Sequence, residues 1–132
     1  MNDVSLSEYV HKAVPGLIAL YRFGSQAKGT ARPASDIDLA ILSRDPIPNL
    51  RRFELAQELA IRLHRDVDLV DLRTASTVMR MQVISTGECL FTVNDRLQGE
   101  FEDLVYSTYA RLNEERREIL NDIRARGSVY AG

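Results

Sequence analysis

Apolar residues occur along this chain in two patterns, short runs and spacings of three or four residues, and each pattern predicts one kind of element. Four apolar runs, rich in strand-forming residues and bounded by turn residues, predict strands over residues 17–23, 36–42, 65–72 and 88–93. Apolar residues three or four positions apart predict helices over residues 5–14, 49–63, 74–87 and 94–127. The pattern therefore predicts an α+β fold in which helices are interspersed with about four strands.

Polar residues and glycine indicate where the helices start and stop. Ser5, with Glu8 three residues later, has the spacing of a capping box and is expected to cap the first helix. Asn49 is expected to cap the second helix, and Gly87 to end the third. The second helix is expected to bury one apolar stripe, made of Leu50, Phe53, Ala56, Leu59, Ala60 and Leu63.

The final helix, at about 95–126, is longer than a small core requires. Its apolar positions include Leu97, Phe101, Leu104, Val105, Thr108, Leu112, Ile119 and Ile123. Leu112, Ile119 and Ile123 extend the stripe past the point where a small core should end, so we expect a partner surface here. The charges of RLNEERREIL also fit i,i+3 and i,i+4 pairing, which leaves a self-stabilised helix in solvent as the alternative.

Composition and charge bound the class of protein. With 132 residues, 45% of them hydrophobic and 27% charged, the chain is expected to form a single globular domain, 1–132. Its 17 Lys and Arg against 19 Asp and Glu give a formal charge of -2. Proteins that coat nucleic acid normally carry a basic surplus, so direct nucleic-acid binding is not expected.

Nothing in the sequence indicates export or membrane insertion. Its N-terminal stretch MNDVSLSEYV has no basic region followed by an apolar core, so no signal peptide is expected. No apolar run approaches the roughly 18 residues that span a bilayer. The single cysteine, Cys89, excludes an internal disulfide and fits a reducing compartment. We therefore expect a cytoplasmic protein that makes no membrane contact.

Two acids, Asp36 and Asp38, stand two positions apart at the start of the second predicted strand. Strand residues two apart share a face, so these carboxylates should lie close together and repel each other. A strand end in solvent is the simplest explanation of the pair taken alone. The alternative is a site for divalent cations, because Mg²⁺ is held by carboxylates, substrate phosphates and water. Two such ions clamp the attacking and leaving oxygens of a phosphoryl-type displacement.

A third carboxylate is expected from the segment RDVDLVD. Asp68 is the strongest candidate because its apolar neighbours place it in mid-strand, where solvent exposure is least expected. Asp66 is expected at the start of the strand and Asp71 at its end, and each of them stays an alternative. A charged residue within an apolar strand needs a partner, and a metal shared with the neighbouring DID strand supplies one.

The pair Gly24-Ser25 stands where the first predicted strand turns. A glycine there lets the backbone approach a ligand, exposed N–H groups hold anions such as phosphate, and the serine hydroxyl adds a donor. Taken alone, GS after a strand is usually only a turn. Lys28 lies in the same turn and is either a phosphate contact or a solvated loop lysine, whereas Arg22 is expected to be structural.

The spacing of these residues resembles the signature of polymerase-beta-like nucleotidyltransferases, namely Gly24-Ser25, ten intervening residues and Asp36-x-Asp38. FGSQAKGTARPASDIDLAIL matches the motif region, DVDLVDL the third-acid strand, and VISTGECLF the following helix-to-strand step. Over most of its length the chain resembles the minimal nucleotidyltransferase (MNT) family. That resemblance implies a small mixed sheet of about four strands flanked by helices, without additional nucleotide-binding domains.

The resemblance also implies an activity and a partner. Many MNT proteins are antitoxins paired with a HEPN ribonuclease toxin, and family members transfer AMP from ATP to a tyrosine hydroxyl of that toxin. Carried over, Asp36 and Asp38 bind two Mg²⁺ ions, while Asp68 binds the catalytic ion and helps to deprotonate the hydroxyl. Gly24 and Ser25 hold the ATP triphosphate. A hetero-oligomer with the toxin is then expected.

Two other functions stay open on the sequence. One is an antitoxin that blocks the toxin by direct binding without catalysis. The other is a nucleotidyltransferase for a small molecule. The lack of any obvious second substrate-binding domain counts against it. The intact set of Gly24, Ser25, Asp36, Asp38 and Asp68 favours the enzyme that modifies a toxin.

Overall fold

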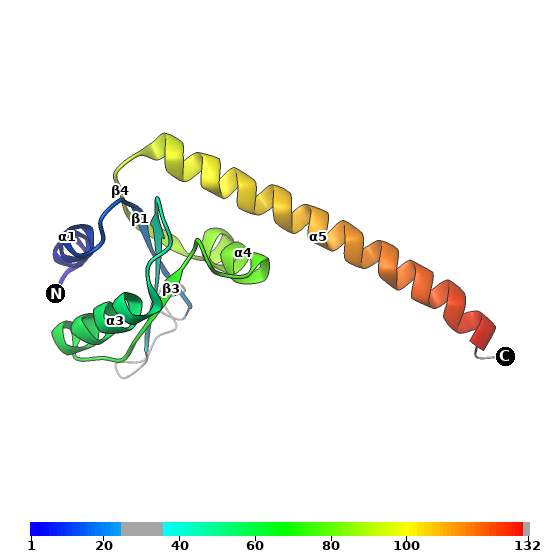
Figure 1. The fold of residues 1–132 in the computed structure, drawn as a ribbon, viewed down its shortest axis with the longest axis horizontal. Coiled ribbons are helices and arrows are strands. Elements are labelled where there is room, and N and C mark those ends of the chain that lie inside the picture. Colours follow the sequence, from blue (N-terminus) through cyan, green and yellow to red (C-terminus); the bar gives the residue numbers. More distant parts are fainter. Residues whose placement is uncertain (25–35, 131–132) are drawn as a thin grey trace.

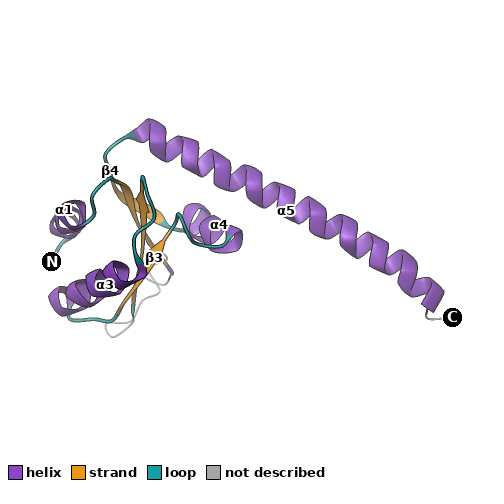
Figure 2. Cartoon of the chain, in the orientation of Figure 1, coloured by secondary structure: helices purple, strands orange, loops and turns teal. Residues whose placement is uncertain are grey.

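The computed structural model describes residues 1–24 and 36–130, and its helices and strands match the predicted α+β pattern. The predicted elements are present with ends shifted by a few residues, and the last helix continues beyond 126 (Figure 2). The elements, in chain order, are α1 (Asp3–Ala13), β1 (Leu17–Phe23), β2 (Ile37–Ser43), α3 (Asn49–Leu63), β3 (Val67–Asp71), α4 (Thr77–Thr86), β4 (Glu88–Thr92) and α5 (Asp95–Tyr130).

The four strands form one mixed sheet in the order β3-β2-β1-β4. Strand β1 runs antiparallel to both of its neighbours, β2 and β4, whereas β2 and β3 are parallel. Helices α1 and α3 cover one face of the sheet, and α4 with the first part of α5 lies against the other (Figure 1). The small mixed sheet flanked by helices is confirmed.

Each face of the sheet has its own apolar core, as the alternation of side chains along β2 requires. Leu39 and Ile41 point into the core beneath α1 and α3, which also contains Leu6, Val10, Val14, Leu17, Leu20, Ile37, Leu55, Leu59 and Leu69. Ala40 and Leu42 point into the core beneath α4 and α5, which also contains Ile18, Ala19, Tyr21, Phe23, Leu72, Val83, Ile84, Phe101 and Val105.

The two predicted N-terminal caps are wrong, although both helices form. Helix α1 begins two residues earlier than expected, and its cap is Asn2, whose Oδ1 accepts a hydrogen bond of 2.8 Å from the Ser5 N–H. In α3, Asn49 is already the first helical residue, and Pro48 takes the cap position without a side-chain hydrogen bond. Helix α4 does end at Gly87, and Ser76 caps its start.

The predicted buried stripe of α3 is wrong in its first turns. Leu50 and Phe53 are 69% and 61% exposed, whereas Leu55 and Leu59 are fully buried. The reason is the phase of the helix, because nine residues make about two and a half turns, so Leu50 and Leu59 lie on opposite sides. Only one side of α3 meets the sheet, and Leu50 points away from it.

Helix α5 is anchored to the rest of the molecule by its first third. Phe101 and Val105 are buried against the sheet and α4, and the Tyr21 hydroxyl donates a 3.2 Å hydrogen bond to Glu102 Oε2. Beyond these residues the helix runs past α4 and away from the sheet (Figure 1). Within residues 1–24 and 36–130, no helix combines the length and the sustained apolar character that a bilayer-spanning segment needs.

Candidate active site

The topology of the sheet brings the predicted motif residues to one edge. Because β1 is antiparallel to β2 and β2 is parallel to β3, the end of β1 meets the starts of β2 and β3. Phe23 is paired with Asp38, and Asp38 is paired in turn with Asp68. Gly24, directly after β1, therefore lies near Asp38 of β2 and Asp68 of β3, although these residues are far apart along the chain.

Gly24 and Asp38 pack so closely that only glycine fits at position 24. A Cβ added to Gly24 would lie 2.2 Å from Asp38 Oδ2 and 3.1 Å from its Cγ. The backbone of Gly24 also has φ +70°, a conformation that other residues adopt only with strain. Gly24 therefore lies directly against the Asp38 carboxylate.

The environment of Asp38 disfavours its negative charge. Partial burial, followed by the charges of Asp68 and Asp36, raises the pKa of the Asp38 carboxyl above its ordinary value. Asp36 and Asp68 are exposed, whereas Asp38 is half-buried between them. The expectation that Asp68 would be shielded is therefore wrong, because β3 is an edge strand and Asp68 lies at its open end.

The two alternative acids of this segment have different surroundings. Asp71 is buried and accepts hydrogen bonds of 2.9 Å from the backbone N–H groups of Ile47 and Arg73, one on each carboxylate oxygen. It thus holds the loops at the far end of β3. Asp66 is exposed just before β3, where its carbonyl accepts a 2.9 Å hydrogen bond from the Ile37 N–H. Of the three, only Asp68 is paired with Asp38.

The donor set at this edge fits a hard divalent cation completed by a substrate. In the described part of the chain, no three acidic, histidine or cysteine side chains gather closely enough to hold a metal ion. Mg²⁺ does not require such a cage, since one or two carboxylates, substrate phosphates and water commonly complete its octahedron. Asp38 and its neighbouring acids offer carboxylate oxygens whose mutual repulsion a cation relieves.

Other predicted site residues and their surroundings complete the description. Ser25 and Lys28 lie outside the described residues, so their nucleotide contacts stay predictions. Arg22 pairs with Asp3 and Glu88 on the opposite face of the sheet, in agreement with a structural role. The partners Asp3 and Glu88 were missed on the sequence, because they lie 19 and 66 residues from Arg22 and no local pattern links them.

In this mixed sheet, Gly24 and the acids Asp38 and Asp68 meet at one edge, an arrangement compatible with a nucleotidyltransferase, and comparison with known families identifies the class. The family described as "Polymerase beta, Nucleotidyltransferase" matches residues 5–96, which include all the motif residues. The chain belongs to this family, and the predicted minimal nucleotidyltransferase fold is confirmed.

Comparison with individual proteins shows which members of the nucleotidyltransferase family this chain resembles. The chain is 40% identical over 133 residues to the protein adenylyltransferase MntA of Shewanella oneidensis, covering 99% of this chain and 94% of that protein. A crystal structure of a toxin–antitoxin complex with AMP-PNP matches with a TM-score of 0.85 and 40% identity, covering 93% of this chain and 98% of that chain. A structure of the tri-AMPylated Shewanella oneidensis HEPN toxin in complex with MNT antitoxin matches with a TM-score of 0.77 and 37% identity, covering 92% and 94%. The resemblance to MNT antitoxins is thereby confirmed.

Proposed function

We propose that this protein is an antitoxin that transfers AMP from ATP to a tyrosine hydroxyl of a HEPN toxin. The observation that carries the proposal is the meeting of Gly24, Asp38 and Asp68 at one sheet edge in a chain of this family. It is supported by the near full-length similarity to a protein adenylyltransferase and to structures of a toxin–antitoxin pair. A reaction that consumes ATP is expected in the cytoplasm.

In the proposed reaction, the tyrosine oxygen forms a bond to the α-phosphorus of ATP. The bond from that phosphorus to the oxygen that bridges to the β-phosphate breaks, pyrophosphate leaves, and the hydroxyl proton passes to a base. Asp36 and Asp38 would hold two Mg²⁺ ions, and Asp68 would share the catalytic one. When bound, Mg²⁺ lowers the pKa of the attacking hydroxyl and neutralises the leaving pyrophosphate.

The chain's own residues have separate tasks in this proposal. Asp68, which is exposed at the open end of β3, would receive the hydroxyl proton. Gly24, which has no side chain between the turn and Asp38, lets the triphosphate lie close to the acids. Ser25 would donate a hydrogen bond to the triphosphate, and Lys28 would add a positive charge.

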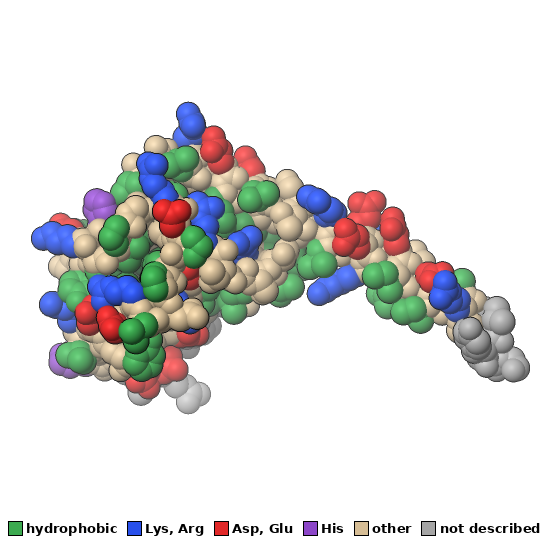
Figure 3. All heavy atoms as spheres, viewed as in Figure 1, with side chains coloured by type: hydrophobic (Ala, Val, Ile, Leu, Met, Phe, Trp, Pro, Cys, Tyr) green, Lys and Arg blue, Asp and Glu red, His purple; other side chains and the backbone are tan. Residues whose placement is uncertain are grey.

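The surface proposed to receive the toxin is the outer part of α5. Ile119, Leu120 and Ile123 are 59%, 52% and 56% exposed, although they are large and apolar. Along this stretch, acidic side chains gather on one edge of the helix and hydrophobic side chains on the other (Figure 3). An amphipathic helix that exposes large apolar side chains is suited to a groove or helix of another protein. Hetero-oligomer formation with the toxin follows from this proposal.

The test is intact-mass spectrometry of the cognate HEPN toxin after incubation with this protein, ATP and Mg²⁺. Whole AMP units should be added by the natural protein and by an Asp45→Asn variant, since Asp45 is exposed near the opposite end of β2. The variants Asp38→Asn and Asp68→Asn should add none. If both variants neutralise the toxin fully without any mass gain, the protein acts by binding alone. Modification of a small molecule but not of the toxin would point to the other alternative.

A further inference from the structure

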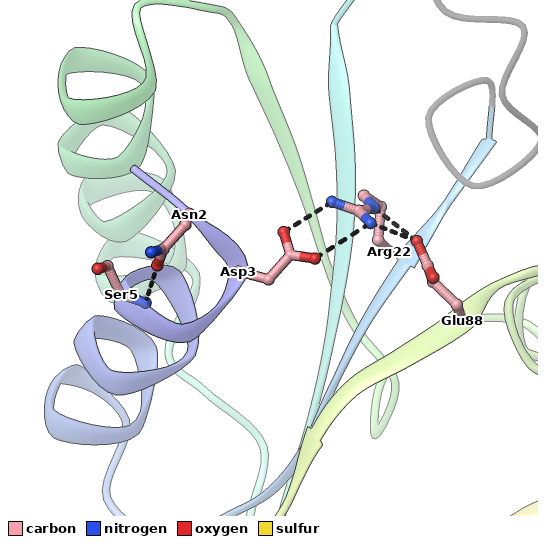
Figure 4. Close-up of polar contacts among 5 residues, drawn as sticks. All are labelled: Asn2, Asp3, Ser5, Arg22 and Glu88. Carbon is pink, nitrogen blue, oxygen red and sulfur yellow. Dashed lines mark hydrogen bonds and ion pairs between the residues drawn. The ribbon is translucent and has the colours of Figure 1, made fainter.

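Arg22, in β1, links α1 to β4 through Asp3 and Glu88 (Figure 4). Its neighbour Phe23 is paired with Asp38, so Arg22 lies on the face of the sheet opposite to Asp38. Its Nη1 and Nη2 donate to the two carboxylate oxygens of Asp3, in the first turn of α1, at 3.0 and 3.4 Å. Its Nε donates to Glu88 Oε1, at the start of β4, at 2.8 Å, and its Nη2 contacts the same oxygen. We call these three residues, Asp3, Arg22 and Glu88, the Arg22 clamp.

The clamp lies immediately before the turn that leads to the site. Arg22 is two residues ahead of Gly24, and the residue between them, Phe23, is paired with Asp38. Side chains alternate along a strand, so the clamp holds this exit of β1 from the face that Asp38 does not occupy. The exit of β1 is thereby fixed just before Gly24.

The backbone of the same exit is also held from the α4–β4 junction. A Cβ added to Gly87 would lie 2.9 Å from the carbonyl oxygen of Arg22 and 3.2 Å from Phe23 Cβ. Glu88, the next residue, is the clamp partner that belongs to β4. Gly87 therefore packs closely against the backbone of β1, and Glu88 pairs with the Arg22 side chain.

Arg22 itself is not available to hold a phosphate. Its guanidinium is engaged by two carboxylates, and its side chain is only 24% exposed. Hydrogen bonds to a carboxylate from a planar guanidinium fix orientation as well as distance. Arg22 can therefore influence the site only by fixing the position of the backbone of residues 22–24, not by contacting the nucleotide.

We propose that Arg22 is a positioning residue for nucleotide transfer: with Asp3 and Glu88 it fixes the exit of β1 so that Gly24 stays against the Asp38 carboxylate. This inference rests on the proposed function. A shift of about 1 Å at a site of this kind is enough to cost roughly a hundredfold in rate. Gly24 already packs closely against Asp38, so a shift of the β1 exit would change this contact directly.

The test compares Arg22→Gln with a matched control, Arg51→Gln. Arg51 also pairs with two glutamates, Glu54 at 3.7 Å and Glu58 at 3.3 Å, but all three lie within α3. Two quantities are measured well below the melting temperature: kcat for AMP transfer per folded molecule, and the Kd for Mg·AMP-PNP by calorimetry. Arg22→Gln should lower kcat roughly tenfold to a hundredfold and raise the Kd, whereas Arg51→Gln should change neither.

Variants of the two acidic residues of the Arg22 clamp provide a second test, again by kcat. Glu88→Gln and Asp3→Asn should each lower kcat less than Arg22→Gln does. Combining Glu88→Gln with Arg22→Gln should add little further loss, because residues that act through one contact are not additive. Additive losses, or equal kcat and Kd values in Arg22→Gln and Arg51→Gln at similar melting temperatures, would overturn the inference.

The same measurements separate this inference from the proposed function. If the natural protein binds Mg·AMP-PNP but adds no AMP to the toxin, the proposed acceptor is wrong, and the Kd of Arg22→Gln still tests the clamp. If the natural protein does not bind Mg·AMP-PNP at all, both fail. If transfer and binding are normal in Arg22→Gln, only the clamp fails.

Discussion

Asp38 and Asp68 occupy paired positions on the parallel strands β2 and β3. Neighbouring strands lie about 4.8 Å apart, so the two carboxylates leave the same face of the sheet at close range. The pairing of like charges is unfavourable, and the raised pKa of Asp38 reflects both its partial burial and these neighbours. Concentrated negative charge at a sheet edge is what a bound cation would neutralise, and this contact therefore supports the proposed Mg²⁺ site.

Removing one of these charges should stabilise the protein without ligand. We expect Asp38→Asn to raise the melting temperature at neutral pH by about 1 to 4 °C, since the repulsion is relieved but screened by solvent. Millimolar Mg²⁺ with AMP-PNP should raise the melting temperature of the natural protein and leave that of the variant unchanged. Differential scanning calorimetry measures both effects. A less stable variant that still responds to Mg²⁺ would contradict the assignment of Asp38.

Gly24 should not tolerate even the smallest side chain. We expect Gly24→Ala to abolish AMP transfer, because the new Cβ would collide with Asp38 Oδ2 and the backbone has φ +70°. The matched control is Gly99→Ala in α5, where an added Cβ meets nothing within 4 Å. That change should preserve activity and stabilise the helix by up to about 1 kcal/mol. Transfer kinetics and urea unfolding of both variants measure the difference.

Tyr21 should make the stability of the protein fall at high pH. Burial, followed by the nearby charge of Glu102, raises the pKa of the Tyr21 hydroxyl above its ordinary value. The unfolded chain loses this proton near pH 10, before the folded protein does, so the free energy of unfolding decreases as the pH rises above about 10. The loss approaches about 1.4 kcal/mol per pH unit for one proton.

The Tyr21→Phe variant tests this dependence. It lacks the ionisable group and should lose about 1 kcal/mol at neutral pH with the hydrogen bond to Glu102, but decline less steeply above pH 10. Urea unfolding between pH 8 and about pH 11 gives both slopes. Tyr106→Phe, which removes a phenol that is 45% exposed, serves as the control and should follow the natural protein.

The outer part of α5 should govern affinity for the toxin. We expect Ile123→Glu to weaken toxin binding at least about tenfold, while the free energy of unfolding changes by less than about 0.5 kcal/mol because Ile123 is exposed. Asn121→Glu adds the same charge two positions away, on the opposite side of the helix, and should bind normally. Calorimetric titration with the toxin measures the affinity of each variant. Equal affinities of the two variants would place the interface elsewhere.

Several features of this protein were determined locally, within short stretches of sequence. The apolar runs at 17–23 and 36–42 already indicate strands β1 and β2, and the turn residues between them indicate where the chain reverses. The spacing from Gly24 to Asp36 and Asp38 resembles that of one family, to which the chain does belong. Such features depend on neighbours in the chain, so the sequence alone is enough to predict them.

The contacts that make the site depend on which strands become neighbours, and only the tertiary structure decided them. Asp68 faces Asp38 because β3 lies beside β2 in parallel, whereas the sequence favoured Asp68 but kept Asp66 and Asp71 as alternatives. Likewise, the phase of α3 exposes Phe53, and Asp3 and Glu88 reach Arg22 from 19 and 66 residues away. The local pattern of apolar residues indicates on which side of its helix or strand a side chain lies. Long-range packing determines which other helices or strands that side contacts.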